Sequence, residues 1–192
     1  MKRMVLFVSA IGLFLLLISF IFDSFIFNFV VSHRINFLSP LMIGISYIGS
    51  EIIIFLIGTS LLLFHEHRNK FILPLWSSMI LSVLIMFLLK IIIARPRPSG
   101  FALMSFSSYS FPSGHATLAF STLPVIFKSF KTFRWFWFVL VLLIGFSRIY
   151  VGVHYLSDVI TGAILGYFIG ELVLYLNNKK SIYERLISFN PF

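Results

Sequence analysis

The sequence contains no cysteine and very few charged residues. Of its 192 residues, 11% are charged, and only six of them are acidic. The absence of cysteine excludes disulfide bonds, thiolate catalysis and cysteine-ligated metal sites. The scarcity of charge excludes an ordinary soluble domain, because the surface of a water-soluble protein must be largely polar.

Hydrophobic residues make up 59% of the chain, and the mean hydropathy is +1.04. These values predict an integral membrane protein, with the lipid bilayer as its environment. The length suits one domain comprising residues 1–192. The formal net charge of +9 does not indicate nucleic-acid binding, because no basic run exceeds two residues and the charges lie between apolar stretches.

A bilayer-spanning helix needs about 20 mainly apolar residues. We therefore predict an all-α bundle of six transmembrane helices. The stretches that predict them are Met4–Phe22, Leu41–Phe64, Phe71–Ile93, Gly114–Phe127, Phe133–Phe146 with its continuation, and Tyr155–Leu176. The fourth is short and contains Pro124, but the charge pattern requires a crossing there. The first begins with basic residues like a signal peptide, but no small-x-small cleavage site follows, so we expect it to be retained.

Basic residues give the predicted orientation in the membrane, because they are enriched on the cytoplasmic side. With the N-terminus inside, ten of the 15 basic residues are cytoplasmic. Both termini are then cytoplasmic, and the protein is a multi-pass protein of the cell membrane. The other five basic residues lie at the outer face: Arg34, Lys90, Arg95, Arg97 and Arg148.

Three motifs are predicted to lie at this outer face, all within residues 90–158. They are Lys90 with Arg97-Pro98 seven residues later; Pro112-Ser113-Gly114-His115; and Ser147-Arg148 followed by His154 and Asp158. The first ends the third predicted helix, the second begins the fourth, and the last joins the fifth to the sixth.

The cations of these motifs indicate an anion site. A charged residue such as Lys90 within a transmembrane helix costs about 2.5–3.5 kcal/mol on insertion scales and usually marks a functional site. Lys90, Arg97 and Arg148 would repel one another, and we expect only Asp158 to offset them. A multivalent anion such as phosphate is the natural partner. For any one of these cations alone, extension of the side chain to the interface is the alternative.

The other motif residues fit phosphoryl transfer. Backbone N–H groups at Ser113-Gly114 can bind a phosphate oxygen. His154 and Asp158 are four residues apart, so the carboxylate can fix the tautomer and leave the other ring nitrogen free to attack phosphorus. His115 would then act as general acid and afterwards as general base. A local structural hydrogen bond is the alternative for the His–Asp pair considered alone.

The three motifs resemble those of the type 2 phosphatidic acid phosphatase superfamily, which includes membrane lipid phosphatases, soluble acid phosphatases and vanadium haloperoxidases. The resemblance implies that His154 is the nucleophile, Asp158 its orienting partner and His115 the acid–base residue. It also implies that phosphate is held by Lys90, Arg97, Ser113, Gly114 and Arg148. The family needs no metal, so we expect no metal and no cofactor.

The predicted function is hydrolysis of a lipid phosphate or diphosphate at the extracytoplasmic face. Polyprenyl diphosphate, phosphatidylglycerophosphate and phosphatidate are all possible substrates. A phosphotransferase that uses the same site, and a non-catalytic protein that binds or transports lipid phosphates, are the alternatives. The oligomeric state is left open.

Two further features carry weaker expectations. The loop Ser99–Phe111 is rich in serine and aromatic residues, so it is expected to lie in the membrane interface, either as a connector or as a route for lipid. Glu51 is expected about ten residues into the second helix, where it needs a polar partner. A buried structural hydrogen bond is the first expectation for it, and a bond to the Lys90 region is the alternative.

Overall fold

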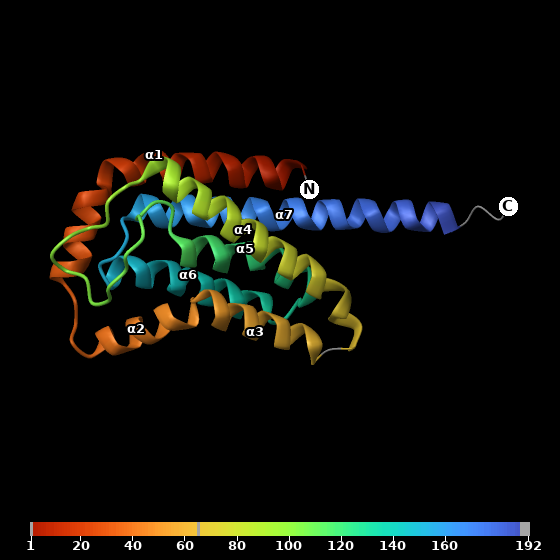
Figure 1. Ribbon diagram of the computed structural model, residues 1–192, viewed down its shortest axis with the longest axis horizontal. Helices are drawn as coiled ribbons and strands as arrows, with labels where there is room; N and C mark the ends of the chain where they lie inside the picture. The colour runs from red at the N-terminus through yellow and green to blue at the C-terminus, as the bar shows by residue number, and fades with distance from the viewer. Residues whose placement is uncertain (1, 65, 189–192) are drawn as a thin grey trace.

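The computed structural model describes the backbone of residues 2–64 and 66–188 and the side chains of residues 11–64 and 68–179. The regular secondary structure of this part of the chain is all helical, with no strand, so the predicted all-α class is confirmed (Figure 1). The elements are α1 (Lys2–Ser32), α2 (Leu38–Ile48), α3 (Glu51–Leu63), the 3₁₀ helix η1 (Glu66–Phe71), α4 (Ile72–Ile93), α5 (Gly114–Ser129), α6 (Arg134–Tyr150) and α7 (Leu156–Ser188).

The stretch Leu41–Phe64 is not one helix, as predicted, but two. α2 ends at Ile48 and is followed by Gly49. Ser50 has extended backbone, and α3 lies at an angle of 68° to α2. Packing also requires glycine at the break: a Cβ on Gly49 would stand 3.4 Å from Cδ2 of His115 and closer still to Ile144. The single-helix prediction is wrong because hydropathy does not register such a break.

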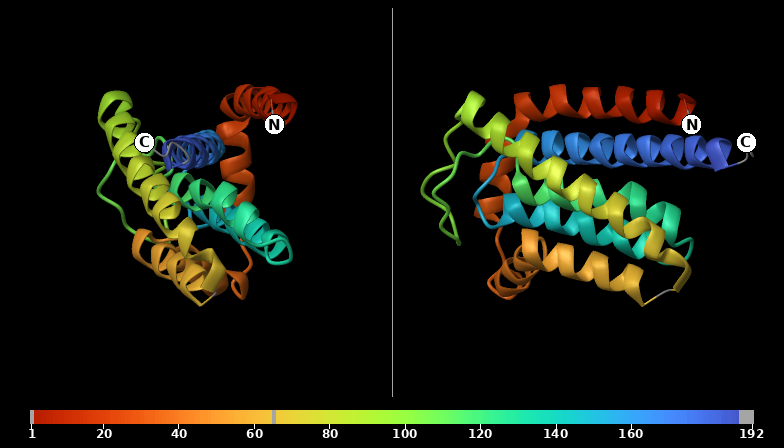
Figure 2. Two further views of the ribbon diagram at one scale, coloured as in Figure 1. Left: turned by 90° about the vertical axis from the view of Figure 1, so that its right-hand side faces the viewer. Right: turned by 45° about the vertical axis from the view of Figure 1, so that its right-hand side comes forward.

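The first helix is longer than the predicted stretch Met4–Phe22 and continues to Ser32. Figures 1 and 2 show that α1 bends, so that its C-terminal part crosses the ends of other helices, and α1 contacts both α6 and α7. The predicted stretch stops immediately before Asp23, a charge of the kind that is costly in lipid. In the structure Asp23 is buried against Arg95 at 2.9 Å, so the charge does not interrupt the helix.

Small residues allow α7 to pack closely against α5. Gly162, Gly166 and Gly170 repeat every four residues on the face of α7 that touches α5. A Cβ on Gly162 would stand 2.7 Å from the carbonyl oxygen of Ser113, and one on Gly166 would collide with the backbone of Thr117. Such small-residue stripes let helix backbones approach in membranes. This contact sets the separation between the start of α5 and the start of α7.

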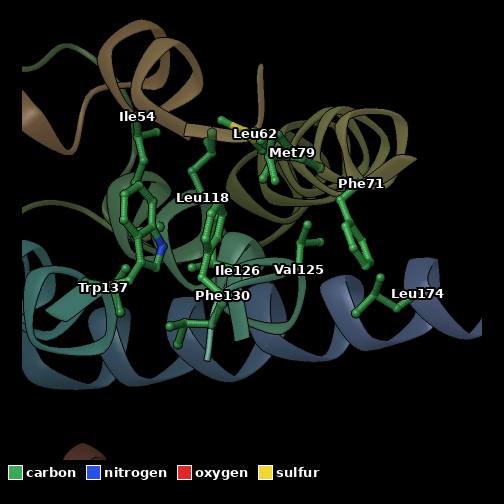
Figure 3. Packing of buried hydrophobic residues seen from close by; sticks show 14 of the residues in the cluster. Ile54, Leu62, Phe71, Met79, Leu118, Val125, Ile126, Phe130, Trp137 and Leu174 are labelled. Atoms are coloured by element: carbon green, nitrogen blue, oxygen red, sulfur yellow. The ribbon is translucent and has the colours of Figure 1, made fainter. Parts of the chain in front are cut away.

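The apolar core draws on helices α3 to α7 (Figure 3). Trp137 is 1% exposed, and its indole N–H donates to the hydroxyl of Thr122 at 2.7 Å. The labelled side chains of Ile54, Leu118 and Ile126 lie close to it in Figure 3. Because this buried core joins α3 to α7, it holds the helices that carry the site at fixed positions.

Three helical segments among the described residues are long and apolar enough to cross a membrane: Ile11–Ser32, Arg68–Ile93 and Leu156–Lys179. The bent pair α2 and α3 gives a fourth if it is counted as one span. α5 and α6 have 16 and 17 residues, which correspond to about 24 and 26 Å at 1.5 Å per residue, against a hydrocarbon core of about 30 Å. The six-span topology with cytoplasmic termini therefore stays a prediction.

Candidate active site

The three motifs meet at one end of the bundle. The segment from the end of α4 to the start of α5 and the turn between α6 and α7 lie together there, and the beginning of α1 and the end of α7 point the other way (Figures 1 and 2). All eight predicted site residues come from these four helix ends and the segments next to them.

His154 and Asp158 form a buried pair. Nδ1 of His154 lies 3.3 Å from Oδ2 of Asp158, and the two residues are 2% and 0% exposed. Nε2 of His154 lies 3.1 Å from Nη1 of Arg97. A guanidinium N–H can only donate, so Nε2 is the acceptor and Nδ1 carries the proton. This tautomer leaves the Nε2 lone pair available as a nucleophile.

Both oxygens of Asp158 are held by the protein. Oδ2 also accepts from the hydroxyl of Ser110 and, at 2.9 Å, from the backbone N–H of Tyr155. Oδ1 accepts from Arg95 at 2.8 Å. The carboxylate is therefore fixed in the plane that orients His154.

Arg95 and Asp23 were missed as site residues. Arg95 bridges Asp158 and Asp23 at 2.8 and 2.9 Å, so Asp23 adds a second carboxylate beside Asp158. The negative charge of Glu51 also acts on Lys90 and Arg148, so the expectation that only Asp158 offsets the three cations is wrong. A signal was present in the sequence: Asp23 is a charge within an apolar run, the same argument that singled out Lys90. Ser110, which binds Asp158, had no such signal.

Arg97 contacts Nε2 of His154, and Arg148 and Lys90 belong to the same charged group, since the charge of Arg148 acts on His154 and the charges of Arg97 and Arg148 act on Lys90. Arg97 also donates to the carbonyl oxygen of Val153 at 2.9 Å. Arg148 is fully buried, and its Nη1 donates to the hydroxyl of Ser46. Nζ of Lys90, itself 7% exposed, donates to the carbonyl oxygen of Tyr109.

The aromatic ring of Phe106 lies over this cationic group. Its centroid is 4.9 Å from Cζ of Arg97 and 4.7 Å from Cζ of Arg148, within the range of cation–π contacts. The ring of His115 meets it edge to face at 6.2 Å. His115 therefore lies on the same side of His154 as the two arginines.

Ser113 and Gly114 begin α5 as predicted. The N–H of Ser113 donates to the carbonyl oxygen of Asp158 at 3.0 Å, which joins the starts of α5 and α7. The hydroxyl of Ser113 is buried and has no hydrogen-bond partner among the described residues. Nε and Nη2 of Arg148 are also buried and have no hydrogen-bond partner among the described residues. Buried polar groups are nearly always paired in proteins, so these three groups are free to bind a ligand.

The charged environment shifts the proton affinity of His154. Burial lowers its pKa to about 3, and the positive charges of Arg148 and Arg97 act in the same direction. The hydrogen bond to Asp158 opposes them. His154 is therefore neutral at physiological pH, as a nucleophile must be.

Glu51 does not lie where the sequence placed it. Its side chain is exposed at the start of α3, so the expected buried hydrogen bond is wrong. Oε1 of Glu51 stands 3.9 Å from the position of a Cβ built on Gly114. Glu51 also begins an apolar groove of about 490 Å³ between α3 and α4, lined further by Phe55, Val83 and Leu118.

The loop Ser99–Phe111 exposes apolar side chains, among them Phe101, Leu103 and Tyr109. Such a surface is unfavourable in water and suits the membrane interface. Its place in a membrane stays a prediction. Ser110 and Phe111 at its end are buried, so the loop also closes over the site.

Residues 71–182 match the PAP2 superfamily, and the chain belongs to this superfamily. The chain is 28% identical over 170 residues to an undecaprenyl-diphosphatase of Sulfolobus acidocaldarius, covering 84% of this chain and 81% of that protein. It is 29% identical to phosphatidylglycerophosphatase B of Bacillus subtilis, covering 76% and 78%. A crystal structure of a transmembrane PAP2-type phosphatidylglycerolphosphate phosphatase from Bacillus subtilis superposes with a TM-score of 0.74 at 26% identity, covering 89% of this chain and 96% of that one.

Proposed function

We propose that the protein hydrolyses a lipid phosphate or diphosphate through a phosphohistidine intermediate, without a metal, at the extracytoplasmic face of the cell membrane. One observation carries the proposal. The nucleophilic Nε2 of His154 faces a cluster in which the buried donors Arg148 Nε, Arg148 Nη2 and Ser113 Oγ have no partner in the described part of the protein. A phosphoryl group has the oxygens that these donors need.

In the first step, the Nε2 lone pair of His154 attacks phosphorus and the bond from phosphorus to the lipid oxygen breaks. His115 donates its proton to that leaving oxygen. Lys90, Arg97 and Arg148 stabilise the charge on the other phosphoryl oxygens, the positioning role that dominates phosphoryl transfer.

In the second step, neutral His115 takes a proton from water as the water oxygen attacks phosphorus. The bond from phosphorus to Nε2 breaks, which releases inorganic phosphate and returns neutral His154. Asp158 holds the proton of Nδ1 throughout and stabilises the positive charge that the ring carries while it is phosphorylated.

The exposed apolar surface around the site favours a lipid substrate. The groove between α3 and α4 is lined almost wholly by apolar side chains and begins beside Gly114. It can accept part of a hydrocarbon chain while the headgroup enters the cationic cluster. The relatives named above act on undecaprenyl diphosphate and phosphatidylglycerophosphate, so these two lipids and phosphatidate are the substrates to test.

The first experiment measures phosphate release from these three lipids by the purified protein in detergent with EDTA. We expect release by the wild type and none by His154→Ala. His33→Ala is the control, because His33 is exposed and bonded to its own helix at Phe29. Loss of activity in EDTA that a divalent metal restores would refute the metal-free mechanism.

The same assay distinguishes the alternatives. Consumption of lipid phosphate only when a second lipid acceptor is present would indicate a phosphotransferase. Binding of lipid by both the wild type and His154→Ala, without turnover in either, would indicate a binding or transport protein. A binding or transport protein has no use for the oriented pair of His154 and Asp158, whereas a phosphotransferase uses the pair as hydrolysis does, so only the assay separates these two reactions.

The membrane side can be tested separately because the chain has no cysteine. Ser107→Cys lies in the exposed loop near the site, and Lys131→Cys is exposed between α5 and α6. We expect a membrane-impermeant maleimide to label Ser107→Cys in intact cells and Lys131→Cys only after lysis. The opposite result would place the site at the cytoplasmic face.

A further inference from the structure

The helix α1 contributes a carboxylate to a buried ion network behind the catalytic pair. Arg95 donates from Nη1 to Asp158 at 2.8 Å and from Nη2 to Asp23 at 2.9 Å. Asp23 is 5% exposed and Asp158 is 0% exposed. Burial makes an unpaired charge costly, so the three ionic groups depend on one another.

Asp23 also holds the start of α7. Its Oδ1 accepts from the backbone N–H of Ser157 at 2.8 Å, and its Oδ2 accepts from the Ser157 hydroxyl. The first N–H groups of a helix have no partner within the helix, so a side chain of α1 supplies a cap for α7. Asp158 is the next residue along that turn. Asp23 therefore fixes the backbone next to Asp158 through Ser157, and the Asp158 carboxylate through Arg95.

Arg95 is itself clamped. Nη1 bonds the Ser157 hydroxyl at 2.7 Å as well as Asp158, and Cζ lies 4.3 Å from the ring centroid of Tyr155. The guanidinium fork thus has a partner on each side and a ring against its face. Because Arg95 is held in this way, the position of Asp23 determines that of Asp158, and its charge acts on Asp158 through the guanidinium between them.

We propose that Asp23 and Arg95 are positioning residues for the reaction, which act through Asp158 to orient His154 and to set its charge environment. The inference rests on the proposed function, because it assigns a role in the same hydrolysis. It places a working part of the site on α1, outside residues 71–182 that match the superfamily. Neither residue touches the substrate, so kcat should fall and KM should change little.

The pH profile separates this role from a merely structural one. Asp23→Asn removes a negative charge beside Arg95, which lowers the proton affinity of His154 and moves the acid limb of the rate profile to lower pH. Arg95→Gln removes a positive charge and moves the limb to higher pH. Opposite shifts cannot arise from two variants that only loosen the fold. The other charged or titratable groups that face His154 are Asp158 on α7, Arg97 in the loop, Arg148 on α6, His115 on α5 and Lys90 on α4.

The experiment measures kcat, KM and the acid limb for wild type, Asp23→Asn, Arg95→Gln and Arg95→Lys, with a thermal melt in detergent for each. We expect kcat to fall about 10- to 100-fold in all three variants, the scale found for residues that orient a catalytic group. The acid limb should move by about half a pH unit to lower pH in Asp23→Asn and to higher pH in Arg95→Gln. Arg95→Lys keeps the charge but loses the forked guanidinium, so the acid limb should stay in place.

Ser19→Ala is the matched control. Ser19 is fully buried on α1 one turn before Asp23, and among the described residues its hydroxyl bonds the carbonyl oxygen of Leu16 in the same helix. It should keep wild-type kcat and pH dependence. Wild-type kinetics in Asp23→Asn, or limbs that move together, would overturn the inference while leaving the proposed function intact. No release by the wild type would instead refute the proposed function itself.

Discussion

The two sides of His154 are built differently. On the Nδ1 side, both oxygens of Asp158 have hydrogen-bond partners, which come from three residues besides His154: Arg95, Ser110 and Tyr155. On the Nε2 side, Arg148 is fully buried but two of its nitrogens have no partner among the described residues. The polar groups on the Nδ1 side are satisfied by the protein itself, whereas the donors on the Nε2 side need a bound anion as their partner.

Because of this difference, changes on the two sides of His154 should affect stability in opposite directions while both impair activity. Hydrogen bonds on the Nδ1 side both stabilise the fold and orient His154, the proposed nucleophile, so a change there should lower both stability and activity. The Nε2 side gathers like charges at a cost to the fold, as buried unpaired charges do. A change there should impair activity and improve stability. The predictions below test this contrast, starting with the largest effect.

Asp158→Asn should lower kcat by about 10⁴-fold, as loss of the correct histidine tautomer does in a Ser-His-Asp triad. It should also lower the melting temperature, because Arg95 loses a partner. Phosphate release and a thermal melt in detergent check the two effects. The control is Glu171→Gln on the same helix, whose carboxylate bonds Tyr167 and lies away from the motifs. An active Asp158→Asn protein would mean that the Nδ1 side does not serve catalysis.

Arg148→Met should lower kcat/KM by about 10²- to 10³-fold, because it removes donors for the transition-state charge. In the absence of phosphate it should raise the free energy of unfolding by about 1 kcal/mol or more. Melting the wild type and the variant with and without inorganic phosphate measures this. If the variant were less stable than the wild type without phosphate, the contrast between the two sides would be wrong.

The rate should depend on pH in a bell shape, because attack needs neutral His154 and a protonated His115. The pKa of His154 is lowered by burial from 6.5 to about 3, so its acid limb should lie below pH 6.5. The unfolded chain binds a proton between these values and the folded one does not. The contribution of neutral His154 to the free energy of unfolding is therefore fully present above pH 6.5 and is lost as the pH falls toward 3. A rate that rises steadily into alkaline pH would contradict the paired roles.

Gly162→Ala should push α7 away from α5, since its Cβ would stand 2.7 Å from the carbonyl oxygen of Ser113. We expect a loss of about 1–3 kcal/mol in stability and a fall in kcat, as overpacking separates the two motifs. Gly44→Ala in α2 is the control, because nothing lies within 4 Å of its added Cβ. Equal melting temperatures for the two variants would mean that the close contact is not required.

The smallest effect concerns the turn that carries Arg95 and Arg97. Ala94 ends α4 with φ of 48°, a left-handed conformation that costs an L-residue about 1 kcal/mol. Ala94→Gly should therefore stabilise the protein by up to about 1 kcal/mol and leave kcat unchanged, whereas Ala94→Val should destabilise it. Thermal melts of the pair check the sign, and a stabilising valine would contradict this account.

Sequence reasoning found the residues that motifs mark and missed those that only packing brings near. His154 and Asp158 lie four residues apart, so one helical turn joins them. Asp23 and Ser157 are 134 residues apart, and only the bend of α1 across the bundle brings them together. Pairings at such separation depend on helix packing, which no local pattern encodes. The charge of Asp23 in an apolar run is the one signal in the sequence that points to its role.

The helix boundaries could likewise be predicted only in part. Their type and the ends that border the motifs follow from hydropathy, and α4 ends at Ile93 as predicted. The break between α2 and α3 does not follow, because Gly49 and Ser50 interrupt the run without lowering its hydropathy enough. That break moves Glu51 from the predicted helix interior to an exposed helix start.

The length of α7 has a practical consequence. Its 33 residues span about 50 Å at 1.5 Å per residue, well beyond the 30 Å or so of hydrocarbon in a bilayer. Figure 1 shows it projecting past the rest of the bundle. A fluorescent protein joined after Ser188 would stand on a rigid stalk, clear of the lipid and far from the catalytic end. Such a fusion offers a way to count copies or follow diffusion in living cells while turnover continues.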